Sequence, residues 1–422
     1  MYQKKVLNNG IRIVSEEIPY VRSVAIGIWV GVGSRDETEE EHGISHFIEH
    51  LMFKGTSNRS AKEIAESLDA VGGQLNAFTT KEYTCYYAKV LDEHLDLAID
   101  VLSDMFFNSL FAYKDIEKEK KVVLEEIKMY EDSPDELVHD LFATHVWAKH
   151  TLGKPILGTC DSVAALTGEK VNNFYKNHYT NPNVVIAVAG KINHQQLVEK
   201  LAPTFEGLKG QAIKKDKGLP NPHKGVMCSE KTTEQLQLCI GVPGLSQESE
   251  DIYKVHLINN ILGGGLSSRL FQEIREERGL AYSVYSYHSA FRDCGLFTVY
   301  SGTSPNNADE VTELVLNELA KLATEGVDEQ ELCRTKEQIK GNIYLGLESV
   351  SSRMSRMGKS ELCFNRLITP EEVIDNIVKV NTSDIQKIAV QLFDHKKIAI
   401  ATIGPSCRNE KLEGLINSYG TS

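Results

Sequence analysis

No stretch of this 422-residue sequence is apolar for long enough to cross a bilayer as a helix. The first residues, Met-Tyr-Gln-Lys-Lys-Val, lack the apolar centre of a signal peptide and predict a strand instead. The eight cysteines are scattered and form no C-x-x-C pair, a usage typical of a reducing compartment rather than of a disulfide framework. We therefore expect a cytoplasmic, bacterial protein that does not insert into a membrane.

Positive charge is scarce as well. The chain has 46 Lys and Arg against 59 Asp and Glu, which gives a formal net charge of −13 at pH 7. Nucleic-acid binding needs a basic footprint, so this balance argues against a nucleic-acid partner. The acidity is compatible with basic peptides as ligands, although net charge of either sign also serves simply to keep a protein in solution.

Hydrophobic periodicity stops near the middle of the chain. Residues 206–225 are rich in Gly, Pro and Lys, a composition that marks a linker. The length also exceeds what one hydrophobic core usually serves. We predict a first domain over residues 1–208, a linker over 209–224 and a second domain over 225–422.

The two predicted domains resemble each other in sequence pattern. A strand-like run at Val24–Val30 leads through a loop to a helical pattern at Ile44–Phe53, and Leu236–Val242 leads similarly to Tyr253–Leu262. An offset of roughly 212 residues superposes the halves, which is a repeat of domain size. Strands mixed with longer helices predict two homologous α+β domains, each a mainly antiparallel sheet packed with helices.

The helical pattern at Ile44–Phe53 has two different faces. One face is apolar and consists of Ile44, Phe47, Ile48, Leu51 and Met52. His46 and His50 lie on the opposite stripe one turn apart, the spacing that lets both rings reach a single zinc ion. Glu49 shares that stripe, where a carboxylate can act on a water molecule at the metal. The pattern His-x-x-Glu-His therefore predicts a catalytic zinc site.

Two histidines leave a catalytic zinc one protein ligand short. In the helix predicted from Asp115 to Tyr130, Glu119 and Glu126 are seven residues apart and stack on one line two turns apart. Apolar residues flank that line, and a carboxylate in such surroundings is rarely left unpaired. Spacing alone does not distinguish Glu125 from Glu126 as the third ligand. The alternative interpretation is that residues 115–130 form an ordinary surface helix with salt bridges and carry no ligand.

Together, these features resemble the pitrilysin family of metallopeptidases. The resemblance rests on His46-Phe-Ile-Glu-His50, on the Leu-Met-Phe-Lys-Gly-Thr that follows, and on a glutamate 76 residues beyond the second histidine. It covers essentially the whole chain and is greatest to the short-chain branch, the mitochondrial processing peptidase β subunits and their bacterial relatives. It implies that one zinc per chain is bound by His46, His50 and Glu126. It also implies that Glu49 is the general base, and that Glu119 is not a ligand itself but orients the site.

The resemblance also implies how a peptide substrate is held. Members of the family bind the peptide as an added strand at a sheet edge near the zinc. Here that edge would be Asn76-Ala77-Phe78-Thr79, which follows two glycines. Backbone hydrogen bonds at a sheet edge hold an extended peptide whatever its sequence, which suits a protease of broad specificity.

Specificity would come from side chains around the cleaved bond. Glu136 and Asp140 lie one turn apart and match positions where processing peptidases hold an arginine just before the cut, and paired carboxylates suit a guanidinium group. A solvated acidic turn around Pro134 is the alternative interpretation. Phe53, on the zinc-facing stripe, would form the floor of an apolar pocket for the residue after the cut.

The second domain lacks metal ligands, because the offset places His50 against Leu262. The resemblance implies that its Arg275 and Tyr282 act on the scissile carbonyl, and a guanidinium and a phenol are suitable donors to the oxyanion. The three glycines at residues 263–265 predict a hinge, a bare backbone surface or a simple helix stop. They are not a phosphate loop, because no Gly-Lys-Ser/Thr follows.

These patterns predict a zinc-dependent endopeptidase that cleaves extended peptides or presequence-like segments, either in processing or in degradation. The resemblance further implies a closed chamber formed by a homodimer. The alternative is a non-catalytic scaffold like the core subunits of the respiratory bc1 complex. Such relatives have typically lost metal ligands, whereas this chain keeps the full set.

Overall fold

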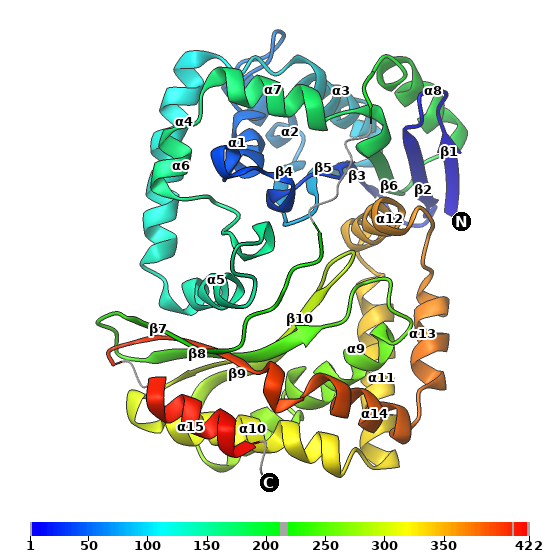
Figure 1. Ribbon diagram of the computed structural model, residues 1–422. Coiled ribbons are helices and arrows are strands. Elements are labelled where there is room, and N and C mark those ends of the chain that lie inside the picture. The colour runs from blue at the N-terminus through cyan, green and yellow to red at the C-terminus, as the bar shows by residue number, and fades with distance from the viewer. Residues whose placement is uncertain (1, 212–217, 407–408, 420–422) are drawn as a thin grey trace. The chain divides into compact units, whose positions relative to one another are not determined.

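The computed structural model describes residues 2–211, 218–406 and 409–419 (Figure 1). None of the helices in these described residues is long and apolar enough to span a membrane. The chain forms two compact units. Unit 1 consists of Met1–Lys128, Lys154–Lys217 and Leu345–Ile368, and unit 2 consists of Met129–Gly153, Gly218–Tyr344 and Thr369–Ser422.

Unit 1 contains a six-stranded sheet in the order β1-β2-β6-β3-β5-β4. Only the β2–β6 pair is parallel. The strands are β1 (Tyr2–Val6), β2 (Arg12–Glu17), β3 (Ser23–Val30), β4 (Gln74–Thr79), β5 (Thr84–Leu91) and β6 (Val184–Gly190). The predicted N-terminal strand is β1, which pairs with β2 in a hairpin, and Gly10 in the turn has a φ of 93°, which glycine adopts at no steric cost.

The helices of unit 1 are α1 (Ile44–Leu51), α2 (Ala61–Asp69), α3 (Leu95–Asn108), α4 (Tyr113–Glu131), α6 (Cys160–Ala164), α7 (Gly168–His178), α8 (His194–Phe205) and α12 (Val350–Phe364). Successive side chains of a strand point to opposite faces. In β3, Val24 and Ile26 therefore belong to the core that includes α1, α3 and α4. Ala25 and Trp29 face the other way and pack against Met354 of α12.

Unit 2 contains a five-stranded sheet in the order β7-β11-β8-β10-β9, in which only β7 and β11 pair in parallel. The strands are β7 (Gly225–Glu230), β8 (Leu236–Gly244), β9 (Ala281–Ala290), β10 (Gly295–Thr303) and β11 (Ala399–Gly404). The helices are α5 (Pro134–Val146), α9 (Ile252–Gly263), α10 (Ala308–Thr324), α11 (Glu329–Gly346), α13 (Pro370–Lys379), α14 (Thr382–Leu392) and α15 (Asn409–Tyr419), with a π-helix at Phe271–Glu277.

The two units share one plan, which confirms the predicted α+β class with two homologous domains. In each, one face of the sheet carries most of the helices and the other face packs against a single helix. That single helix comes from the opposite half of the sequence: α12 in unit 1 and α5 in unit 2. The compact units therefore differ from the predicted residue ranges 1–208 and 225–422 by the exchange of these two segments.

Candidate metal centre

Two features stabilise the N-terminus of helix α1. Gly43 precedes the helix with a φ of 89°, a conformation that favours glycine. The carboxylate of Glu37 is buried and accepts hydrogen bonds from the backbone N–H of Gly43 at 2.8 Å and of Ser45 at 2.9 Å. Burial raises the pKa of Glu37 to about 8, although both N–H donors oppose the shift. No pattern in the sequence pointed to Glu37.

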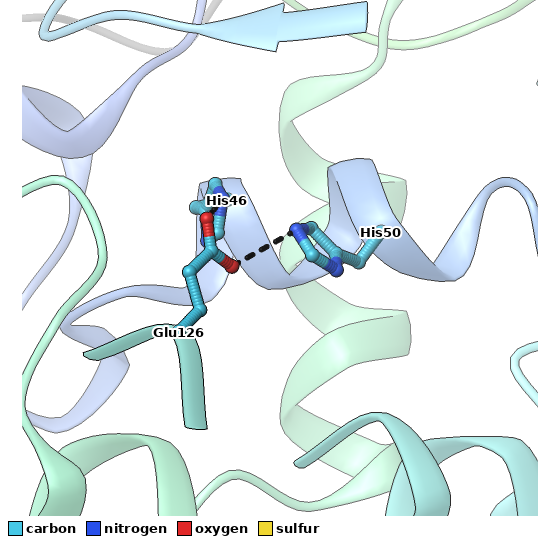
Figure 2. Close-up of side chains that lie close together, drawn as sticks. All are labelled: His46, His50 and Glu126. Carbon is cyan, nitrogen blue, oxygen red and sulfur yellow. Dashed lines mark ion pairs between the residues drawn. The ribbon is translucent and has the colours of Figure 1, made fainter. Parts of the chain in front are cut away.

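The five apolar residues predicted for one face of α1 and the turn after it are all buried, at most 1% exposed: Ile44, Phe47, Ile48, Leu51 and Met52. Their burial in the core of unit 1 fixes the rotation of the helix. The opposite stripe is thereby directed at α4 (Figure 2), where Glu126 lies opposite the two histidines.

The side chains of His46, His50 and Glu126 converge. Glu126 Oε1 lies 3.7 Å from His46 Nε2, and Glu126 Oε2 lies 3.4 Å from His50 Nε2. One ligand atom from each of the three residues lies within 4.8 Å of the others. Glu125 is instead 70% exposed and pairs with Lys128 at 2.7 Å. The structure therefore places Glu126, and not Glu125, beside the two histidines.

The chemistry of this group fits a zinc ion. Nitrogen from two histidines and oxygen from a carboxylate are the ligands of catalytic zinc sites. Glu126 Oε2 is buried and has no hydrogen-bond partner among the described residues, a costly condition that a cation would relieve. Burial lowers the pKa of His46 to about 3 and so keeps its ring in the neutral form that binds metals.

Glu119 contacts the His50 ring through Nδ1. Its carboxylate is 1% exposed and accepts a hydrogen bond from His50 Nδ1 at 2.9 Å, while Lys54 Nζ lies 2.9 Å from its other oxygen. Burial opposes ionisation, yet the hydrogen bonds from His50 and Lys54 hold the pKa of Glu119 below its ordinary value. Because Nδ1 carries the donated hydrogen, Nε2 keeps its lone pair for a metal. Lys54 lies one turn beyond His50, a spacing readable from the sequence that our sequence analysis did not use.

Glu49 lies on the same stripe of α1, within electrostatic reach of His50 and Glu126. Its Oε2 accepts a hydrogen bond from Thr79 Oγ1 at 2.5 Å. Burial raises the pKa of Glu49, against the opposing effect of Thr79. Phe53 follows α1 and packs, partly buried, against the core of unit 1. Thr79 is a contact of the predicted base that sequence reasoning missed, because only the folded sheet brings β4 to α1.

Among the described strands, β4 is the last of its sheet, so its edge on the side away from β5 pairs with none of them. Asn76 is exposed, and Ala77 packs on the core side of the sheet. The Phe78 ring lies on the other side, with its centroid 5.6 Å from that of Trp29. The predicted peptide-binding residues therefore do form a sheet edge, in the same unit as His46, His50 and Glu126.

Arg275 and Tyr282 are neighbours in unit 2. The guanidinium carbon of Arg275 lies 4.7 Å from the ring centroid of Phe271 and 4.6 Å from that of Tyr282, a cation–π arrangement on both rings. Arg275 belongs to the π-helix, a rare element that is frequent at functional sites. Tyr282 is 75% exposed. Both residues belong to unit 2, whereas His46, His50 and Glu126 belong to unit 1.

Glu136 and Asp140 also belong to unit 2, on α5. Glu136 is exposed and Asp140 half-buried, and Tyr130 hydrogen-bonds to the Asp140 side chain and to the Glu136 carbonyl oxygen, the latter at 3.1 Å. In the part of the chain that the structure describes, no Lys or Arg forms an ion pair with either carboxylate.

Comparison with known proteins gives family matches and close relatives for this chain. Residues 12–160 match the family described as insulinase (peptidase family M16), and residues 165–339 match the peptidase M16 inactive domain. The uncharacterized zinc protease YmxG of Bacillus subtilis is 50% identical over 408 residues, which cover 96% of this chain and 99% of that protein. An uncharacterized zinc protease of Streptomyces coelicolor is 44% identical over 413 residues, covering 96% and 89%.

Solved structures share the fold. A protease from Helicobacter pylori has a TM-score of 0.89 at 23% identity, covering 96% of this chain and 99% of that one. A chain of complex III from Candida albicans has a TM-score of 0.85 at 19% identity, covering 98% and 99%. With a relative that is 50% identical along nearly the whole chain, this protein belongs to peptidase family M16, the pitrilysin family that its sequence resembles.

Proposed function

We propose that this protein is a zinc-dependent endopeptidase, with one zinc per chain bound by His46, His50 and Glu126. The observation that carries the proposal is the convergence of these three side chains, with a buried oxygen of Glu126 that has no hydrogen-bond partner. Zinc, when bound, supplies Lewis-acid chemistry that polarises a carbonyl and makes water more acidic. The names of the relatives, zinc proteases, agree with this assignment.

Glu49 is the general base of the proposed reaction. It accepts a proton from the water that attacks the scissile carbonyl and returns that proton to the leaving amine. Its place on the histidine stripe of α1 and its hydrogen bond to Thr79 support this role. Glu119 holds the His50 ring through Nδ1. Arg275 and Tyr282 are the proposed donors to the carbonyl oxygen as negative charge develops on it.

The substrate of the proposed reaction is an extended peptide. It would add as a strand to the unpaired edge of β4, along Asn76, Ala77 and Phe78. Phe53 would contact the side chain after the cut. In this proposal, the first domain performs the chemistry and the second, which lacks metal ligands, contributes contacts to the substrate.

We further propose a preference for arginine two or three positions before the cut. It is supported by the carboxylates of Glu136 and Asp140, which lie one turn apart without a Lys or Arg partner in the described residues. Cleavage-site profiling on a peptide library tests it. We expect arginine enrichment in the wild type and its loss in Asp140→Asn. A flat profile, or enrichment that Asp140→Asn leaves unchanged, would remove the preference.

The function is tested with a quenched fluorescent peptide. We expect cleavage by the purified protein, its loss on treatment with o-phenanthroline, and its return when zinc is added after the chelator is dialysed away. A scaffold protein of the bc1 type would cleave nothing in any of the three states. Cleavage that persists without metal would also exclude the proposed zinc chemistry.

The active enzyme is proposed to be a cytoplasmic homodimer that encloses a chamber, in which the zinc of one chain works with Arg275 and Tyr282 of the other. Such a chamber would exclude folded proteins and admit extended peptides. Co-expression of a Glu49→Gln chain with an Arg275→Ala chain tests it. A mixed dimer has one site with both lesions and one with neither, so activity should return toward half of the wild-type value. No recovery in purified mixed dimers would exclude the shared site.

A further inference from the structure

A run of hydroxyl groups lies behind Glu49 in unit 1. Thr79, the last residue of β4, donates from Oγ1 to Glu49 Oε2 at 2.5 Å. Thr84, the first residue of β5, is paired with Thr79 across the two strands. Its Oγ1 lies 3.5 Å from Thr79 Oγ1 and donates to the carbonyl oxygen of Val32 at 3.0 Å.

Two buried tyrosines continue this run of hydroxyls. The side chain of Thr84 is hydrogen-bonded to Tyr179, whose hydroxyl oxygen lies 2.8 Å from that of Tyr86. The three residues are between 0% and 3% exposed. A buried hydroxyl is costly unless it is hydrogen-bonded. Here each hydroxyl has a partner, and such groups can polarise one another along the run.

The protons of the run can be assigned from its acceptors. Each hydroxyl has a single proton, and Thr84 donates its proton to the carbonyl oxygen of Val32. Its contact with Thr79, at 3.5 Å, is likewise one in which Thr84 is the donor. No neighbour in the run therefore requires the proton of Thr79. That proton is committed to Glu49.

We infer that Thr79 is a positioning residue for Glu49, and that Thr84, which is a donor toward Thr79, leaves the Thr79 proton directed at Glu49. The inference rests on the proposed role of Glu49 as general base. With Oε2 fixed by Thr79, the other carboxylate oxygen is the one that receives the proton from water. Thr79 also ends the edge strand proposed to bind the peptide, so one strand sets the position of both substrate and base.

The experiment removes the hydroxyl and then restores it. Thr79→Val replaces the hydroxyl with a methyl group at nearly the same shape. A hydrogen bond to a charged group is typically strong enough that we expect kcat to fall roughly tenfold to a hundredfold. KM and bound zinc should stay at wild-type values, because neither the strand backbone nor a metal ligand is altered. Thr79→Ser returns the donor and should recover most of kcat.

Thr80→Val is the matched control. The Thr80 hydroxyl donates to the carbonyl oxygen of Tyr83 at 2.8 Å and accepts from turn amides, and it does not contact Glu49. We expect a kcat close to wild type, whatever the cost to stability.

Glu49→Gln separates this inference from the proposed function. If Glu49→Gln cleaves peptides as fast as wild type, Glu49 is not the base and both fail. If Glu49→Gln is inactive but Thr79→Val has the wild-type kcat, only the inference is overturned. A loss of zinc in Thr79→Val, or a rise in KM alone, would also overturn it, because either result assigns Thr79 a structural or binding role.

Discussion

Glu119 offers a way to weaken zinc binding without altering a zinc ligand. Its two oxygens serve two partners, His50 Nδ1 and Lys54 Nζ, each at 2.9 Å. In Glu119→Gln the amide has one carbonyl oxygen, so it can accept from only one of them and must turn its NH₂ group toward the other. The variant therefore loses the charge-assisted hydrogen bond that fixes the His50 ring, or leaves Lys54 unpaired beside a neutral group.

The expected cost follows from the role of such carboxylates. Loss of a partner that orients a metal-binding histidine typically weakens metal affinity 10- to 100-fold, or about 1.4–2.7 kcal/mol. Competition with a chromophoric zinc chelator at pH 7.5 measures the dissociation constant directly. We expect the zinc Kd of Glu119→Gln to rise by that factor, while thermal unfolding of the metal-free protein still gives a cooperative transition.

Glu117→Gln is the control for this measurement. Glu117 lies on the same helix, is 45% exposed and pairs with Lys120 at 2.9 Å. The control variant has the same change in net charge at a surface pair, which contributes little to stability. We expect its zinc Kd to match that of the wild type. Equal zinc affinity in the two variants would refute the reasoning, because His50 would then need no support from Glu119.

Two further variants test the ligand set and the exchanged helix. Glu126→Gln should lower the zinc retained after dialysis, measured by elemental analysis, and full occupancy would mean that the third ligand lies elsewhere. Gly358→Ala should destabilise the protein by roughly 1–3 kcal/mol, the usual cost of overpacking, because a Cβ would lie 2.2 Å from Trp29 Nε1. An unchanged melting temperature would contradict the packing of α12 on unit 1.

Patterns with short sequence spacing predicted local structure well. The apolar face of the helix at Ile44–Phe53 is the buried face of α1, because a three- to four-residue repeat leaves little choice of orientation. The helix predicted from Asp115 to Tyr130 is α4 (Tyr113–Glu131). Within α4, however, spacing could not choose between Glu125 and Glu126. The choice depends on how α4 faces α1, a property of tertiary packing.

Contacts across long sequence separations could not be predicted. Glu37 supports α1 from a loop, and Thr79 reaches Glu49 from the end of a strand. Glu37 stands in no pattern of its own, and the sequence indicated Thr79 only as the end of the predicted edge strand, not as a partner of Glu49. The sequence also could not predict that α5 and α12 are exchanged between the two units. The amphipathic pattern of a helix shows that it packs against something, but it does not specify which of two similar sheets it covers.

The central claim is that Glu49 is the general base of a zinc peptidase. Its most direct test is a paired measurement on Glu49→Gln and the wild type: bound zinc by elemental analysis, and kcat on a quenched peptide. We predict equal zinc in both proteins and a kcat lowered in the variant by roughly 10²- to 10⁴-fold, the usual contribution of general base catalysis. Equal zinc with activity above about a tenth of wild type would contradict the account.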